Sequence, residues 1–231
     1  MSRIGLEFLK APAYRLTDGL VGWMIRVGIH PNAVTAMGFV VTLLAGWFYH
    51  LDHVRTAGFL VLIGGLFDLL DGRVARESGL ASKFGSFFDS TLDRISEIVV
   101  FIGLASLYNT IHPDPQDLAM IYVIMLAMGG SIMVSYTRAR AESLGLDCRV
   151  GIMQRPERVV LLGAASWCFG LDLNAVPLDL AIMFVAVLTN VTAIQRIVWV
   201  FQHAAGVPLD DGFSGGSPPK EGKGGSGEAE T

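Results

Sequence analysis

Long apolar stretches dominate the chain, and short polar segments separate them. Six of these stretches approach or exceed the ~20 residues that a helix needs to cross a bilayer. They lack the alternation of apolar and polar positions found in transmembrane β-strands, and only helices or closed barrels span lipid. The pattern therefore predicts an all-α integral membrane protein with six transmembrane helices at roughly 33–51, 56–75, 86–109, 117–137, 157–172 and 177–201.

The two ends of the chain differ from this middle part. Residues 1–30 are mixed in polarity and could form a cytoplasmic, interfacial amphipathic helix, with Leu20, Trp23 and Met24 among the candidate lipid contacts. An ordinary interfacial connector would explain the same pattern. We expect one six-helix domain over residues 31–205. Residues 206–231 are rich in Gly, Ser, Pro and charge, which predicts a disordered cytoplasmic tail.

Composition and charge placement support a multi-pass membrane protein. The chain is 52% hydrophobic and 16% charged, whereas a soluble domain carries about a quarter charged residues. Of its 17 Lys and Arg residues, only Arg55 falls in a connection on the side facing away from the termini. The positive-inside rule then places both termini, and the basic connections, in the cytoplasm. We expect a protein of the cell (inner) membrane, with membrane lipids and no nucleic acid as partners.

Four aspartates occupy the segment FDLLDGRVARESGLASKFGSFFDSTLDR, residues 67–94. Asp68 and Asp71 come at the cytoplasmic end of the second span, and Asp89 and Asp93 at the start of the third. A spacing of three or four residues returns a side chain to the same helix face. Converging carboxylates would repel one another unless cations neutralised them. Because hard cations prefer oxygen ligands, this predicts a site for two Mg²⁺ ions, with Mn²⁺ as a substitute.

Two other interpretations of these acids were considered. A single acid at a membrane edge is more often a solvated helix end than a metal ligand, but four at these spacings are harder to explain in this way. A cation transporter or channel is the non-enzyme alternative. Such a pathway would scatter acids through the depth of the membrane, whereas the middles of these spans hold almost none.

The segment also resembles the signature of the CDP-alcohol phosphotransferases, integral membrane enzymes of phospholipid synthesis. Eight fixed residues would match by chance at about 10⁻¹⁰ per start position, given average residue usage of roughly 5–8%. The resemblance covers about residues 25–205. The matching pattern is Asp68-x2-Asp71-Gly72-x2-Ala75-Arg76-x8-Gly85-x3-Asp89-x3-Asp93.

The resemblance implies a role for each matching residue. Asp68, Asp71 and Asp89 bind the metals, while Asp93 contacts a metal and acts as the catalytic general base on the incoming hydroxyl. The donor is a CDP-diacylglycerol-type lipid. A Pro-Asn-x-x-Thr element lines the cytidine pocket in the family, and Ser82 replaces the Thr of many relatives. The CDP-lipid-binding residues implied are Pro31, Asn32, Thr35, Asp68, Gly72, Ala75, Arg76 and Ser82.

The acceptor alcohol is indicated by arginines. Arg138 and Arg155 belong to the connection between the fourth and fifth spans and its flanks, and Arg196 lies inside an apolar run. An unpaired charge there is costly, and arginine forks suit phosphate. The positive-inside rule alone would account for about three of the arginines on this side without any ligand. That set is Arg138, Arg140, Arg149, Arg155 and Arg158. We expect Arg138, Arg155 and Arg196 to bind a phosphate on the acceptor.

The segments that carry these arginines are Ser135-Tyr136-x-Arg138-Ala139-Arg140-Ala141-Glu142, Arg155-Pro156-Glu157-Arg158 and Gln195-Arg196. They resemble the prokaryotic phosphatidylinositol-phosphate synthases, which implies transfer to myo-inositol phosphate with release of CMP. The alternative is a phosphatidylglycerophosphate synthase that uses glycerol 3-phosphate, and a serine-accepting synthase ranks third. Archaeal relatives with ether-lipid donors share similar segments, so the lipid tail stays open. The resemblance also implies a homodimer.

Overall fold

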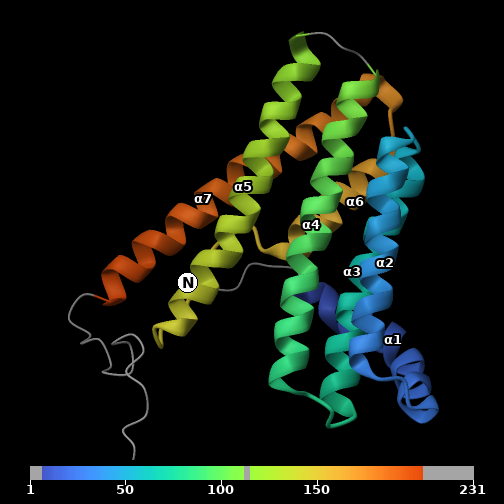
Figure 1. Cartoon of the computed structure of the whole chain (residues 1–231), viewed down its shortest axis with the longest axis vertical. Coiled ribbons are helices and arrows are strands. Elements are labelled where there is room, and N and C mark those ends of the chain that lie inside the picture. The colour runs from blue at the N-terminus through green and yellow to red at the C-terminus, as the bar shows by residue number, and fades with distance from the viewer. Residues whose placement is uncertain (1–6, 112–114, 205–231) are drawn as a thin grey trace, which may run out of the picture.

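The computed structural model of the chain describes residues 7–111 and 115–204, and Figure 1 shows its arrangement. All regular elements within these ranges are helices. The predicted tail, residues 206–231, lies outside them. The elements are α1 (Glu7–Val27), α2 (Pro31–His50), α3 (Val54–Glu77), α4 (Lys83–Ile111), α5 (Pro115–Ser143), α6 (Arg155–Phe169), the 3₁₀ helix η1 (Asp172–Ala175) and α7 (Val176–Ala204).

Proline fixes the start of two helices that carry predicted site residues. Pro31 opens α2, where the lost N–H would have had no partner within the helix. The backbone N–H of Asn32 donates to Nδ1 of His30 at 3.2 Å. Pro156 occupies the first turn of α6, directly after Arg155. The sequence thereby places Asn32 in the first turn of α2 and Arg155 at the first residue of α6.

The helices pack around one apolar core. Helix α2 contacts α3 and α4, α6 contacts α3 and α7, and α5 contacts α4 and α7. Buried side chains from α2 to α7 form this core, including Tyr49, Phe101 and Ile182. Glycine allows α2 and α4 to approach closely, because a Cβ on Gly103 of α4 would lie 2.6 Å from the carbonyl oxygen of Gly46 on α2.

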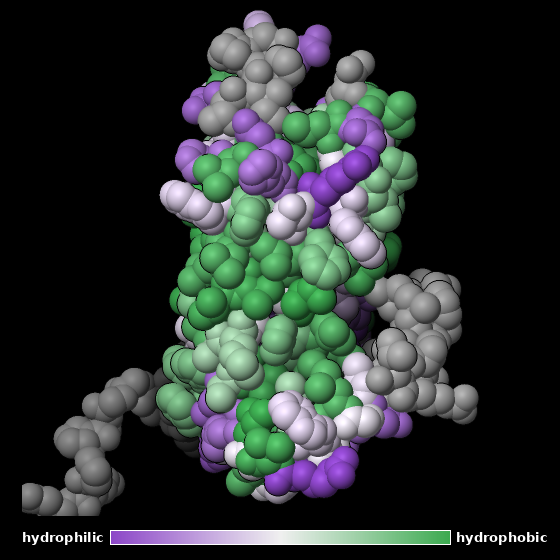
Figure 2. Space-filling view, turned by 90° about the vertical axis from the view of Figure 1, so that its right-hand side faces the viewer, coloured by the Kyte–Doolittle hydropathy of each residue, from purple (hydrophilic) through white to green (hydrophobic). Residues whose placement is uncertain are grey.

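Three helices, α2, α5 and α7, are long and apolar enough to cross a membrane. Figure 2 shows a broad band of apolar side chains between two polar ends on the face in view. Helices α3 and α4 are long but carry the aspartates, and α6, with 15 residues, reaches only about 22 Å against a hydrocarbon core of ~30 Å. The structure supports a helical membrane protein, and six spans remain a prediction.

Helix α1 lies at the end of the bundle where α3 ends and α4 begins (Figure 1). Leu20 and Trp23 are exposed, as lipid contacts require. The expectation for Met24 was wrong, because its side chain is 5% exposed and packs with Val21 in a cluster shared with α2 and α3. Arg73 of α3 fixes α1 further, donating at 2.7 Å to the Thr17 hydroxyl and to Asp18, and at 2.7 Å to Glu77 within α3.

Candidate active site

The four aspartates lie on two helices at the same end of the bundle. Asp68 and Asp71 belong to the last turns of α3, and Asp89 and Asp93 to the first turns of α4. A connection of residues 78–82, with Gly79 in the left-handed region at φ 71°, reverses the chain between them. Asp89 is close enough to both Asp68 and Asp71 for like-charge repulsion. The two helix ends therefore bring these aspartates near one another, and their assignment as metal ligands stays a prediction.

Arg155 bridges the two helices from the start of α6. Its Nη1 contacts Oδ2 of Asp68 and lies 2.8 Å from Oδ1 of Asp93. The guanidinium supplies positive charge where the carboxylates converge, which offsets their mutual repulsion. Its Nε is buried without an acceptor among the described residues. The sequence predicted Arg155 as a ligand of the acceptor phosphate, and the structure places it directly against two predicted metal ligands.

The donor set of the aspartates fits a divalent cation. Asp71 is 4% exposed, and no described residue donates a hydrogen bond to its Oδ2. A buried carboxylate oxygen without a partner is costly unless a cation binds it. Arg155 contacts Asp68 and Asp93. Within the described residues, no group of three or more Asp, Glu, His or Cys side chains is arranged to hold a metal ion. Ions would therefore have to compete with Arg155 for these carboxylates.

A pocket of about 200 Å³ opens beside the aspartates, between the start of α2, the end of α3 and the start of α4. Every predicted CDP-lipid-binding residue except Asp68 lines it. Gly85 also lines it, and a Cβ there would lie 3.1 Å from Oγ of Ser82 and 3.2 Å from Oδ1 of Asn32. The lining is Pro31, Asn32, Thr35, Asp71, Gly72, Ala75, Arg76, Leu80, Ala81, Ser82, Gly85, Ser86 and Asp89.

The three arginines expected to bind one phosphate have different partners. Arg196 is 2% exposed, and its Nη1 donates to the carbonyl oxygen of Val134 and its Nε to that of Val150 at 2.8 Å. Arg138 pairs with Glu142 at 2.8 Å and is near enough to Arg196 for repulsion. Backbone carbonyls satisfy two donors of Arg196, so its burial does not by itself require an acid or an anion.

A second ion pair lies deeper between α4 and α6, and sequence reasoning missed it. Arg158 donates from Nε to Oε1 of Glu97 at 2.6 Å and from Nη2 to Oε2 at 3.1 Å. The signal was present in the spacing, since Glu97 follows Asp93 by four residues and Arg158 follows Arg155 by three. Only the fold shows that these two helix faces meet.

Comparison with known proteins identifies the family. Residues 28–202 match the family model described as CDP-alcohol phosphatidyltransferase. The chain belongs to this family. It is an enzyme of phospholipid biosynthesis, and the resemblance inferred from the aspartate signature is confirmed.

Two relatives illustrate the sequence similarity within the CDP-alcohol phosphatidyltransferases. The chain is 39% identical over 190 residues to archaetidylinositol phosphate synthase of Pyrococcus horikoshii, covering 82% of this chain and 90% of that one. It is 34% identical to phosphatidylinositol phosphate synthase of Streptomyces avermitilis, covering 86% and 83%.

The solved structures are of phosphatidylinositol phosphate synthase from Mycobacterium tuberculosis. The form with CDP-DAG bound has a TM-score of 0.72 and 29% identity, covering 81% of this chain and 94% of that one. The form in complex with manganese and citrate has the same TM-score and identity, covering 80% and 88%. The helical arrangement of this chain is therefore that of a family member solved with a donor lipid and with a divalent metal.

Proposed function

We propose that this enzyme transfers a phosphatidyl or related lipid-phosphate group from a CDP-linked lipid, such as CDP-diacylglycerol, to the hydroxyl of myo-inositol phosphate and releases CMP. One observation carries the proposal: the four aspartates lie between a pocket and a cationic side chain. Asp71 and Asp89 line the pocket, while Asp68 and Asp93 contact Arg155. The relatives named as inositol phosphate synthases support the choice of acceptor.

The pocket beside the aspartates is the proposed site of the CDP group. Asn32 and Thr35 at the start of α2 and Ser82 before α4 offer hydrogen-bonding groups, and Arg76 offers a charge-assisted donor to a phosphate. Gly72 and Ala75 leave room on α3 because their side chains are absent or small. A nucleotide bound here would direct its pyrophosphate toward Asp71 and Asp89.

Asp68, Asp71, Asp89 and Asp93 are the proposed ligands of two Mg²⁺ ions, for which Mn²⁺ can substitute. Such ions, when bound, neutralise the negative charge of a pyrophosphate. The oxygen-only ligand set and the unpartnered Oδ2 of Asp71 support this assignment. The solved relative in complex with manganese supports the use of a divalent metal.

Asp93 is the proposed general base. Its carboxylate accepts the proton of the acceptor hydroxyl, and the hydroxyl oxygen bonds to the phosphorus that carries the lipid. The bond from that phosphorus to the bridging oxygen breaks, and CMP leaves. Asp93 suits this task because it lies beside Arg155, the residue proposed to hold the acceptor, and does not line the nucleotide pocket.

Arg155, with Arg138 and Arg196, is proposed to bind the phosphate of the acceptor. Arg155 is the best placed of the three, since its guanidinium reaches the predicted base. Arg138 is exposed enough to leave Glu142 for a stronger anion. In Arg196, Nε and Nη1 each donate to a backbone carbonyl. We therefore assign the remaining nitrogen, Nη2, to the acceptor phosphate.

We further propose that all six helices α2 to α7 span the cell membrane, with both termini and the active site in the cytoplasm, and that the enzyme is a homodimer. The aspartates, the pocket and Arg155 all lie toward the end of the bundle at which α3 ends. That end faces the water-soluble acceptor in this orientation.

The decisive experiment measures CMP release by the purified enzyme in detergent. CDP-diacylglycerol, or its ether-linked counterpart, is supplied with inositol phosphate, glycerol 3-phosphate, serine or free inositol in turn. We expect turnover with inositol phosphate to exceed that with any other acceptor. Higher turnover with glycerol 3-phosphate would replace the proposed acceptor and leave the family assignment in place.

A further inference from the structure

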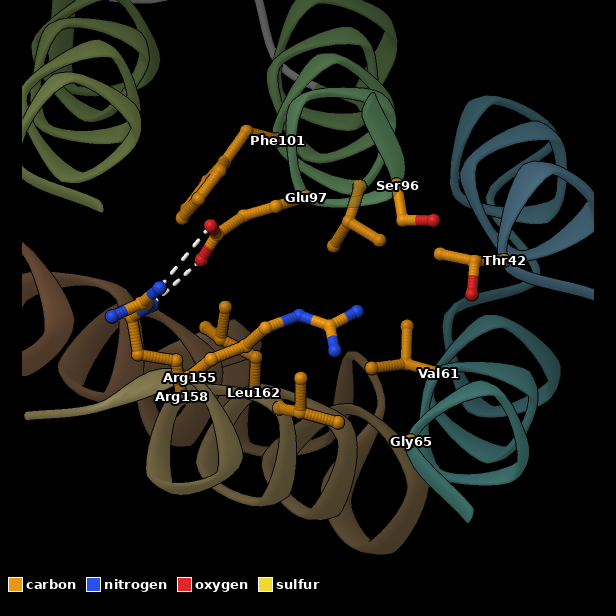
Figure 3. A pocket seen from close by; sticks show the side chains of 11 residues that line it. Thr42, Val61, Gly65, Ser96, Glu97, Phe101, Arg155, Arg158 and Leu162 are labelled. Carbon is orange, nitrogen blue, oxygen red and sulfur yellow. Dashed lines mark hydrogen bonds and ion pairs between the residues drawn. The ribbon is translucent and has the colours of Figure 1, made fainter. Parts of the chain in front are cut away.

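The Glu97–Arg158 ion pair is almost completely buried. Arg158 is 1% exposed, and besides its two bonds to Glu97 it donates from Nη1 to the carbonyl oxygen of Met153 at 3.3 Å. Figure 3 shows the paired groups meeting at one side of a cavity between α2, α3, α4 and α6. Arg158 thus joins three segments: α6, α4 and the connection that precedes α6. It is unavailable to a ligand, unlike Arg155.

This pair and the Arg155 contacts form two successive links between α4 and α6. Asp93 and Glu97 are one turn apart on α4, and Arg155 and Arg158 are one turn apart on α6. Helix α6 packs mainly against α3 and α7. Two charged links therefore join α6 to α4 in addition to the shared apolar core, and the deeper link lies one turn from the contacts of Arg155.

Apolar packing alone does not hold Arg155 in place. A cavity of about 40 Å³ borders Arg155, Glu97 and Arg158, together with Thr42 and Ser96. That volume exceeds what a single water molecule requires. In Figure 3 the Arg155 side chain reaches into this space, whereas Arg158 extends toward Glu97. Because the walls leave room around Arg155, its position depends on its contacts with Asp68 and Asp93 and on the turn of helix that carries it.

We propose that Glu97 and Arg158 are positioning residues that orient Arg155 for the acceptor. A buried ion pair is weak evidence for a role in stability, since apolar residues of similar volume often stabilise a fold as well or better. Its geometry is nevertheless restrictive, because two parallel hydrogen bonds fix both side chains. The pair holds the first turn of α6 at one distance from α4, and Arg155 then faces Asp68 and Asp93.

The inference rests on the proposed function, because its readout is the KM for the acceptor. The test compares the wild type with Glu97→Gln, Arg158→Met and the double variant Glu97→Leu/Arg158→Met. Each single change leaves a buried charge or donor unpaired, so we expect lowered thermal stability. The double variant removes both charges and should recover a melting temperature within a few degrees of wild type. Its KM for inositol phosphate should stay about tenfold above wild type, while the KM for CDP-diacylglycerol changes less than twofold.

A matched control is the pair Arg55–Asp172, which is exposed and lies at the other end of α3. Arg55→Met/Asp172→Leu should alter neither KM. A wild-type acceptor KM in the folded double variant would overturn the inference, as would equal increases in both KM values. If the double variant does not fold, Glu97→Gln retains the side-chain shape and decides by the same readout. If wild type prefers glycerol 3-phosphate, the proposed function fails, and the same variants measured with that acceptor still decide the positioning role.

Discussion

Nη1 of Arg155 lies 2.8 Å from Oδ1 of Asp93 and also contacts Asp68. A divalent cation bound by the proposed ligands Asp68 and Asp93 would therefore compete with this guanidinium for their carboxylates. Arg155→Ala should tighten the binding of Mn²⁺ or Mg²⁺ by about tenfold, because a charge-assisted hydrogen bond contributes roughly 1.5–3 kcal/mol and its loss frees the carboxylates. Isothermal titration calorimetry without substrates measures this directly.

The same variant should bind the acceptor more weakly, with a KM for inositol phosphate raised about ten- to a hundredfold. Arg149→Ala is the charge-matched control, since Arg149 is exposed and pairs with Asp147 at 2.7 Å. Weaker metal binding in Arg155→Ala would show that the guanidinium supports the metal site instead of competing with it.

Removal of the metal or of one ligand should abolish most activity. Asp71→Asn is the most informative single change, because Oδ2 of Asp71 is buried without a partner among the described residues, so the fold loses no hydrogen bond there. Turnover should fall by about a hundredfold or more, with the melting temperature in the absence of metal unchanged or raised. Asp68→Asn and Asp89→Asn should lower turnover similarly. Near-normal turnover in excess EDTA would contradict a metal-dependent reaction.

The affinity for the CDP-lipid should distinguish the proposed general base, Asp93, from the proposed metal ligands. Asp93 does not line the nucleotide pocket and Asp71 does. Asp93→Asn should therefore lose turnover while retaining affinity for CDP-diacylglycerol within about threefold, since its proposed role begins when the alcohol attacks. Equilibrium binding of a CDP-lipid to Asp93→Asn and Asp71→Asn provides the comparison. Equal loss in both variants would make Asp93 chiefly a metal ligand.

Gly85 offers a steric test of the pocket. A Cβ there would approach Ser82 Oγ at 3.1 Å and Asn32 Oδ1 at 3.2 Å, so both groups would have to move by a few tenths of an ångström. Gly85→Ala should raise the KM for the CDP-lipid about tenfold, equivalent to roughly 1.4 kcal/mol. The control is Gly129→Ala in α5, where an added Cβ meets nothing within 4 Å. An unchanged KM for the CDP-lipid would show that the nucleotide does not bind in this pocket.

Local patterns in the sequence predicted most of the helices, because apolar run length and proline determine where they begin and end. The stretch 33–51 corresponds to α2, Pro31–His50, and 157–172 to α6, Arg155–Phe169. The convergence of Asp68 and Asp71 with Asp89 followed from helical spacing. Contacts between distant segments could not be predicted, because they depend on which helix faces meet. Met24 is buried and Glu97 pairs with Arg158 for that reason.

The contacts of Arg196 also depend on which helix faces meet. This residue can be tested for two roles, connecting the helices and binding the acceptor phosphate. Its contacts to the Val134 and Val150 carbonyls connect α7 to α5 and to the connection before α6. A further bond, from the Met153 amide to Oγ1 of Thr192 at 3.1 Å, holds this connection to α7. Arg196→Ala should therefore lower the free energy of unfolding by roughly 2–4 kcal/mol, because a buried and a partly buried carbonyl lose their charged donor.

Arg138 is the matched comparison for Arg196. Its side chain is 42% exposed and pairs with Glu142 within one helix, so Arg138→Ala should change stability by no more than about 0.5 kcal/mol. Both variants should raise the KM for inositol phosphate about tenfold if both arginines reach its phosphate, with the donor KM unchanged. Thermal unfolding and the two KM values are measured for each variant. If Arg196→Ala loses stability but keeps the wild-type acceptor KM, Arg196 only connects the helices, and the acceptor phosphate depends on Arg138 and Arg155 alone.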